Sequence, residues 1–159
     1  MQLSFLGQNY PLKVFNTTIN SYKLVFNYSQ FVLTAPVKGI VKSKLEKVLI
    51  DWYKAKAKVE ITNLVNFYID KLGVNYNRIV LKNTKTRWGS CSSKGNLNFN
   101  YNLIKMPKDI LDYVVIHEVC HLKHLNHSKE YWQLVKTMCP DYKEKIKWIK
   151  LNGGEYIVS

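Results

Sequence analysis

The sequence has few acidic residues, almost no arginine, few cysteines and no long apolar segment. Its 159 residues include 24 Lys or Arg but only 11 Asp or Glu, so the formal net charge is +13. A lysine-rich surface attracts anionic partners such as nucleic acids and nucleotides. Only Arg78 and Arg87 are arginines, the residues best suited to phosphates and base edges. This shortage argues against a dedicated nucleic-acid-binding protein and leaves nucleic acid or a nucleotide as a secondary candidate partner.

The missing apolar segment argues against a membrane-spanning helix, which needs about 18 or more consecutive apolar residues. The first seven residues also lack the basic start and the apolar run of a secretion signal. Three cysteines, Cys91, Cys120 and Cys139, form neither an even set nor a C-x-x-C pair. That pattern argues against a disulfide framework and against a cysteine-rich structural zinc site. We expect a cytoplasmic monomer without a membrane partner.

The strongest positive signal is the segment HEVCH at residues 117–121, which lies in an apolar pattern of helical period. On an α-helix His117 and His121 lie one turn apart on the same face, so both imidazoles can bind one metal ion. Glu118 then lies beside the ion, where its carboxylate can take a proton from a water that the metal activates. The segment therefore predicts a zinc hydrolase site with Glu118 as the catalytic residue.

A catalytic zinc ion usually has three protein ligands and one open position, so a third ligand is needed. His124 would lie about 10 Å along a straight helix from His117, too far for one ion. His127 can bind the same ion if the chain reverses just before it, where Asn126 can adopt a left-handed conformation. We therefore predict His127 as the third ligand of one zinc ion per chain, with Glu130 or His124 as the alternatives.

The first half of the chain changes its apolar period once. Short alternating runs separated by turn-forming residues fill the first 37 residues, which predicts an antiparallel β meander. From residue 38 to residue 72 apolar residues recur every three or four positions and end at Gly73. This pattern predicts one long helix, or two nearly continuous ones, with lysines on the outer face.

The second half of the chain shows three short strand patterns followed by three helical ones. The strands are expected over residues 78–82, 86–91 and 97–100. The motif helix is expected to begin near Pro107, and two more helices are expected over residues 129–138 and 141–151. The predicted class is α+β, and we expect a single domain over residues 1–159. Residues 1–73 form its N-terminal β meander and long helix, and residues 74–159 form its catalytic core.

Four separated segments form a further pattern: residues 86–96 (TRWGSCSSKGN), 113–122 (YVVIHEVCHL), 126–132 (NHSKEYW) and 140–142 (PDY). Together they resemble the YgjP-like metal-dependent hydrolase family, whose relatives include the SprT and WLM zincin-type domains. The resemblance implies a compact, minimal gluzincin-like core with a three-stranded sheet packed on the active-site helix. It also implies that His117, His121 and His127 bind the metal and that Glu118 is the catalytic carboxylate.

Peptide hydrolysis is the leading interpretation, with a peptide or protein as the substrate. Glu118 would accept the proton of the attacking water and return it to the leaving amine. The developing oxyanion needs a donor, and the sequence offers Arg87, Tyr131 and His124 without choosing among them. A sheet edge can hold an extended peptide, and residues 97–100 are the candidate edge strand.

Three other interpretations stay open from the sequence. A metal-activated water can also attack phosphorus, so hydrolysis of a nucleotide or another phosphoanhydride is the rival reaction. A protease of the SprT-like kind that acts on proteins bound to DNA would combine peptide hydrolysis with nucleic-acid binding. A non-enzymatic basic binding module is disfavoured, because structural zinc sites are normally closed by four protein ligands, many of them cysteines.

Overall fold

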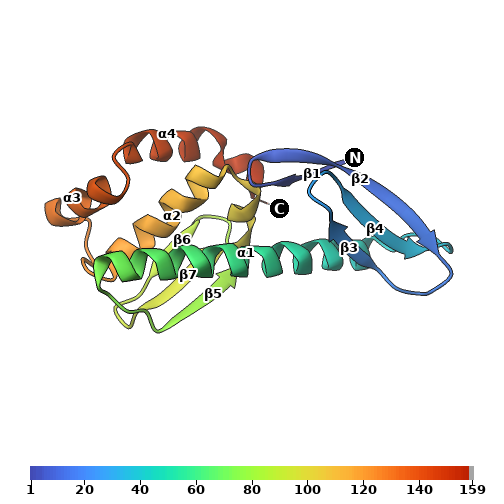
Figure 1. Cartoon of the computed structure of the whole chain (residues 1–159), viewed down its shortest axis with the longest axis horizontal. Helices are drawn as coiled ribbons and strands as arrows, with labels where there is room; N and C mark the ends of the chain where they lie inside the picture. Colours follow the sequence, from blue (N-terminus) through green and yellow to red (C-terminus); the bar gives the residue numbers. More distant parts are fainter. Residues whose placement is uncertain (158–159) are drawn as a thin grey trace.

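A computed structural model describes residues 1–157. The chain forms two lobes along one long helix, α1 (Lys42–Leu72), which runs through most of the length of the molecule (Figure 1). The N-terminal lobe consists of strands β1 to β4 and the first half of α1. The C-terminal lobe consists of the second half of α1 and residues 74–157. The predicted α+β class is confirmed.

The sheet of the N-terminal lobe contains β1 (Gln2–Phe5), β2 (Gln8–Thr17), β3 (Lys23–Phe26) and β4 (Phe31–Pro36). Its order is β1-β2-β4-β3, and β2 runs parallel to β4, so the prediction of an antiparallel meander is wrong at this pair. Burial accounts for the central place of β4, which carries three side chains with at most 1% exposure, Phe31, Leu33 and Ala35. The most buried strand lies between β2 and β3.

Helix α1 packs against both lobes with different faces. Near its start, Leu45, Val48, Leu49 and Trp52 pack on the N-terminal sheet. Further along, Tyr53, Ala57, Ile61, Val65 and Tyr68 are buried in the C-terminal lobe, at spacings of three and four residues. The helix is continuous, which is one of the two forms predicted from the sequence. It ends at Gly73, whose φ of 63° is left-handed and whose N–H bonds to the Ile69 carbonyl.

The sheet of the C-terminal lobe contains β5 (Arg78–Lys82), β6 (Gly89–Cys91) and β7 (Asn96–Asn100), in the order β5-β7-β6. Strand β7 is central, with β5 parallel on one side and β6 antiparallel on the other. The prediction that residues 97–100 form the edge strand is therefore wrong. Leu97 and Phe99 are fully buried, as expected for a central strand. The edge strands of this sheet are β5 and β6.

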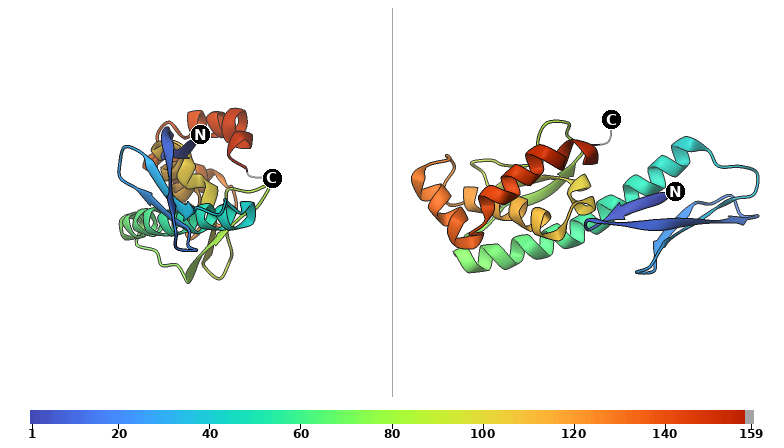
Figure 2. Two further views of the ribbon diagram at one scale, coloured as in Figure 1. Left: turned by 90° about the vertical axis from the view of Figure 1, so that its right-hand side faces the viewer. Right: turned by 90° about the horizontal axis from the view of Figure 1, so that it is seen from above.

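Helical segments complete the C-terminal lobe. These are η1 (Tyr101–Lys105), α2 (Lys108–His121), α3 (Lys129–Met138), α4 (Tyr142–Asn152) and η2 (Gly153–Tyr156). Helix α2 contacts α1, α3, α4 and β6, so the HEVCH segment lies on the most enclosed helix of the molecule (Figure 2). None of the helices within residues 1–157 has the length and apolar character needed to cross a membrane.

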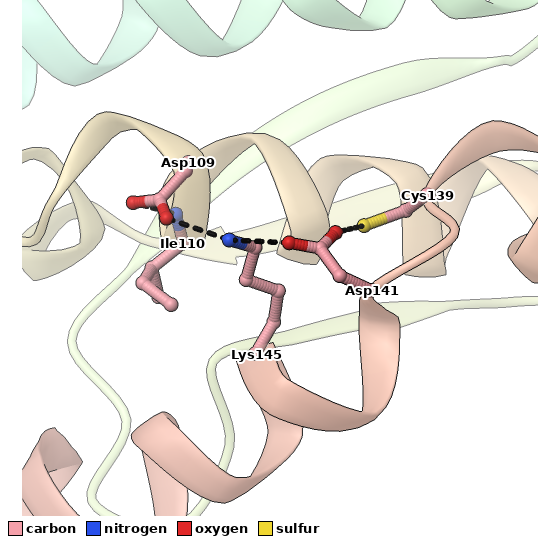
Figure 3. A network of polar contacts seen from close by, with 5 residues as sticks. All are labelled: Asp109, Ile110, Cys139, Asp141 and Lys145. Atoms are coloured by element: carbon pink, nitrogen blue, oxygen red, sulfur yellow. Dashed lines mark hydrogen bonds and ion pairs between the residues drawn. The ribbon is translucent and has the colours of Figure 1, made fainter.

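An ion-pair network fastens α4 to the start of α2 (Figure 3). The Lys145 ammonium lies 2.7 Å from a carboxylate oxygen of Asp109 and 3.0 Å from one of Asp141. The other oxygen of Asp109 accepts the N–H of Ile110, and the Cys139 thiol donates to Asp141. Because Lys145 is only 16% exposed, the network restrains α2 at the end opposite its histidines.

Candidate active site

The last turn of α2 and the start of α3 bring three histidines together. Helix α2 ends at His121, and the N–H groups of Lys123 and His124 bond to the Cys120 carbonyl as the chain turns. The turn does not use the left-handed conformation predicted for Asn126, because the non-glycine residues with positive φ within residues 1–157 are Leu6 and Tyr28. Hydrogen bonds of the turn reverse the chain instead.

Helix α3 then begins beside the last turn of α2. The Ser128 hydroxyl caps it by accepting the N–H of Tyr131 at 3.2 Å. This cap fixes the direction of α3 immediately after His127. The side chain of His127 consequently returns to the face of α2 that carries His117 and His121.

The three imidazoles have the spacing of a metal-ligand set. The Nε2 atom of His127 lies 3.1 Å from Nε2 of His121 and 3.5 Å from Nε2 of His117. Three nitrogens bound at about 2.0–2.1 Å to one tetrahedral zinc ion lie about 3.3 Å apart. Within residues 1–157 these histidines are the group of potential ligands whose atoms all lie within 4.8 Å of one another. Neither His124 nor Glu130 belongs to it.

Hydrogen bonds on the opposite ring nitrogens orient two of these histidines. The Nδ1–H of His121 donates to the His124 carbonyl at 3.0 Å, which leaves Nε2 with its lone pair toward the other rings. Nδ1 of His117 lies 3.1 Å from the Tyr113 hydroxyl. Sequence reasoning missed Tyr113, although it precedes His117 by one helical turn on the same face. His124 contributes its carbonyl to the site as a support for His121.

Burial keeps these histidines neutral, which is the protonation state that binds metal. Burial lowers the pKa of His117 to about 4, and the neighbouring His121 and His127 act in the same direction. Burial also lowers the pKa of His121, although its bond to the His124 carbonyl acts in the opposite direction. A neutral imidazole presents a free lone pair, so burial favours the metal-binding form of His117 and His121.

Tyr131 packs against the histidine group. Its ring is fully buried and stacks on His121, with centroids 4.3 Å apart and planes 17° apart. Its hydroxyl donates to the His117 carbonyl at 2.9 Å, so the O–H is already used. This contact disfavours Tyr131 as the oxyanion donor. Trp132, the next residue, stacks on His127 at 5.6 Å and 20°.

Glu118 lies against the backbone of strand β6. A Cβ atom at Gly89 would lie 2.8 Å from Cγ and 2.9 Å from Oε1 of Glu118, so only glycine leaves room for the carboxylate here. Glu118 is 5% exposed. Burial raises its pKa to about 8, and the Arg87 guanidinium acts in the opposite direction. A divalent cation on the adjacent histidines would also favour the ionised carboxylate.

A cleft of about 200 Å³ opens beside Glu118. One side of its lining is formed by the first residue of β6 and the two residues before it, Arg87, Trp88 and Gly89. The other side is formed by three residues of α2, Val114, His117 and Glu118. Of the predicted oxyanion donors, Arg87 is the one that lines this cleft. Its loop is held by two hydrogen bonds, from the Thr84 hydroxyl to the Arg87 carbonyl at 2.5 Å and from the Asn100 amide to the Thr84 carbonyl at 2.8 Å.

One family model and two solved structures are similar to this chain. A family model described as "YgjP-like, metallopeptidase domain" matches residues 1–152. The crystal structure of the metallopeptidase zymogen abylysin of Pyrococcus abyssi is 23% identical, covers 58% of this chain and 93% of that chain, and has a TM-score of 0.54. The zymogen jannalysin of Methanocaldococcus jannaschii is 24% identical, covers 55% and 93%, and has a TM-score of 0.46. The comparison with curated proteins finds no match.

Proposed function

Because this chain belongs to the YgjP-like metallopeptidase domain family and is a metal-dependent peptidase, we propose that His117, His121 and His127 bind its metal as zinc. The spacing of the three Nε2 atoms, at 3.1 and 3.5 Å for two of the pairs, is the observation that supports this proposal. Three neutral imidazoles without a cysteine are a usual ligand set for catalytic zinc, and they leave a fourth position open. The proposed set is the one that the sequence favours.

Glu118 is the proposed general base. A bound zinc ion supplies Lewis acidity, which polarises the scissile carbonyl and lowers the pKa of a water molecule. The Glu118 carboxylate accepts a proton from the attacking water and delivers it to the leaving amine. Close packing against Gly89 holds the Glu118 side chain beside the histidines, as the proton transfers require.

Arg87 is the proposed donor to the developing oxyanion. Its side chain lines the cleft together with His117 and Glu118, and a guanidinium provides several N–H donors in a plane. The hydrogen bonds through Thr84 and Asn100 hold the Arg87 backbone in place. His124 is disfavoured for this role, because it neither lines the cleft nor belongs to the histidine group.

Strand β6 is the proposed support for the substrate. It pairs with β7 on one side, and no strand within residues 1–157 pairs with its other side. An extended peptide can add to such an edge through main-chain hydrogen bonds. Because β6 contacts α2 and begins at Gly89, a peptide on this edge passes directly by Glu118.

The cleft favours a peptide over a phosphoanhydride. Arg87 is its one basic residue, and its lining includes no lysine and no glycine-rich loop among the described residues. Phosphate groups are usually bound by several basic side chains or by clustered backbone N–H groups. An uncharged peptide carbonyl needs neither.

The decisive experiment compares the wild type with Glu118→Gln on an unstructured protein substrate. We expect the variant to keep about one zinc ion per chain and to lose at least about a thousandfold in kcat/KM, because it lacks the proton acceptor. Zinc is measured by mass spectrometry and cleavage by gel and peptide mapping. Full activity of Glu118→Gln would show that another group is the base.

The ligand set is tested by a matched pair of histidine variants. We expect His127→Ala to lose most of its zinc, whereas His124→Ala should keep it, because the His124 side chain lies outside the histidine group. Equal zinc retention in the two variants would contradict the assignment of His127.

A further inference from the structure

A second and larger cavity lies between the two lobes, away from the cleft beside Glu118. Its volume is about 600 Å³, and it shares no lining residue with that cleft. Its walls come from β1, α1, η1 and η2, and they include three tyrosines, Tyr53, Tyr101 and Tyr156, together with Leu49 and Ile50. The volume is that of a small-molecule site, and its walls combine aromatic and aliphatic side chains with polar ones.

Lys105 is the basic residue among those that line this cavity. Within residues 1–157 the ion pairs shorter than 4.0 Å use Lys42, Lys47 and Lys145, so Lys105 has no carboxylate partner. Its ammonium instead lies 4.5 Å from the centroid of the Tyr53 ring. Burial lowers its pKa to about 8. A partly buried ammonium with one aromatic contact has hydrogen-bond donors that no residue of the chain uses.

The cavity is preformed, because hydrogen bonds fix the walls to each other. The N–H groups of Leu6 and Gly7 bond to the carbonyls of Ile104 and Lys105 at 2.9 and 3.0 Å. The Tyr53 hydroxyl donates to the Ser4 carbonyl at 2.8 Å. The first two bonds join the β1–β2 turn to η1, and the third joins β1 to α1. A ligand entering the cavity would therefore not have to order its walls first.

We propose that this cavity binds a small monocarboxylate with an aromatic or bulky aliphatic body, and that the Lys105 ammonium is its counter-ion. The tyrosine walls fit a flat apolar body, which can pack on them as well as on the aliphatic side chains. The carboxylate then receives the hydrogen bonds that Lys105 does not make within the chain. The site lies apart from the proposed zinc ligands and does not depend on them.

The charges around the cavity limit the ligand to at most one negative charge. Glu46 and Glu155 also line the cavity, and both are exposed at its edge. Two carboxylates and a single lysine repel a dianion such as a phosphate monoester. Phosphate sites usually use arginine or clustered backbone N–H groups, and none of the residues that line this cavity is an arginine. A singly charged carboxylate needs Lys105 as its one counter-ion, and solvent screens it from the two exposed glutamates.

The test is an NMR titration of the full-length, zinc-loaded protein. The probes are N-acetyl-phenylalanine, which mimics a peptide C-terminus, and 3-phenylpropanoate, which has no peptide group. The controls are the corresponding neutral amides. We expect at least one carboxylate to bind with a dissociation constant of about 1 mM or below and to shift the signals of Ser4, Tyr101 and Lys105. Each amide should bind at least about tenfold more weakly than its carboxylate.

Two lysine variants provide a matched comparison. Lys105→Met keeps an unbranched side chain without the charge and should weaken carboxylate binding at least about tenfold. Lys54 is the matched control, because its ammonium also lies over a tyrosine ring, 5.5 Å from the centroid of Tyr101. Since Lys54 does not line the cavity, Lys54→Met should bind the carboxylates as the wild type does.

Several results would overturn the proposal. They are equal binding of acids and amides, unchanged binding by Lys105→Met, shifts confined to the cleft beside Glu118, and no binding at about 10 mM probe. The amide comparison uses the wild-type protein, so it remains decisive if Lys105→Met does not fold. If 3-phenylpropanoate binds as tightly as N-acetyl-phenylalanine, the site recognises the carboxylate and the ring and makes no use of the peptide group. A preference for N-acetyl-phenylalanine assigns it to peptide C-termini.

Discussion

The two lobes share one helix but differ greatly in how much they bury. The main buried cluster of the C-terminal lobe has 22 residues, whereas that of the N-terminal lobe has four. The N-terminal lobe also leaves Phe15, Ile19 and Tyr28 exposed by 57%, 67% and 90%. The histidines and Glu118 lie entirely in the lobe with the larger core. Catalytic groups need fixed positions, and a densely packed core provides them.

The difference also extends to buried polar groups. Glu118, His121, Asn100 and Asn102 are buried in the C-terminal lobe, and the main cluster of the N-terminal lobe contains apolar side chains alone. Asn100 and Asn102 bond to the segment that leads to Arg87. Burying such groups costs free energy unless they are hydrogen-bonded. The larger core therefore stabilises a polar arrangement that the smaller one could not.

The largest effect is expected when one fully buried phenylalanine is replaced in each lobe, which tests the two cores separately. Phe99→Ala should lower the free energy of unfolding by about 3–5 kcal/mol and weaken metal binding, because Phe99 is fully buried in the same cluster as the apolar side chains of α2. Phe31→Ala should cost a similar amount but act on the N-terminal lobe, and metal binding should remain. Hydrogen exchange and zinc content measure the two outcomes. If Phe31→Ala also releases the metal, the lobes unfold as one unit.

A smaller effect is expected where β6 contacts Glu118. Gly89→Ala should reduce kcat about a hundredfold and leave the zinc content unchanged, because the new Cβ would displace the Glu118 carboxylate and not the histidines. Gly154→Ala is the control, since nothing lies within 4 Å of a Cβ placed there. Activity of Gly89→Ala equal to that of the control would show that Glu118 tolerates the shift.

The smallest expected effect concerns the junction between the lobes. The pKa of Lys105 is about 8 in the folded protein and 10.5 when unperturbed. Below about pH 8 burial of the charged lysine destabilises the folded state, between pH 8 and 10.5 this penalty declines, and above 10.5 it is absent. Lys105→Met should therefore be more stable than the wild type by about 1–2 kcal/mol at pH 7, since partial exposure reduces the penalty.

Urea unfolding at neutral and alkaline pH measures this difference. It should shrink as the pH rises from 8 to 10.5. Lys54→Met serves as the control, because Lys54 is exposed. A stability difference that does not change with pH would mean that Lys105 is not buried as a cation.

The sequence predicts the elements whose signals are local. The apolar period and Gly73 give helix α1 and its end, and the HEVCH segment gives the end of α2 with its two histidines. The position of His127 beside them follows from a chain reversal that the sequence also predicts. Its mechanism differs, since turn hydrogen bonds replace the left-handed Asn126. The roles of these histidines as ligands remain predictions.

Pairing between strands is what the sequence does not encode locally. Alternation identifies which side chains share a face, but neither the direction of β2 relative to β4 nor the central place of β7 follows from it. The same limit applies to Gly89, which reads as a turn residue until β6 is packed on α2. Tyr131 reads as a free hydroxyl until its bond to the His117 carbonyl is seen. Each depends on contacts between separate elements.

Helix α1 has 31 residues and is about 46 Å long at 1.5 Å per residue. As a continuous rod fixed in both lobes, it behaves as a lever. A rotation of about 5° about its C-terminal end moves its N-terminal end by roughly 4 Å. Any displacement of strand β3, which contacts α1, would therefore reach α2 through the same rigid element.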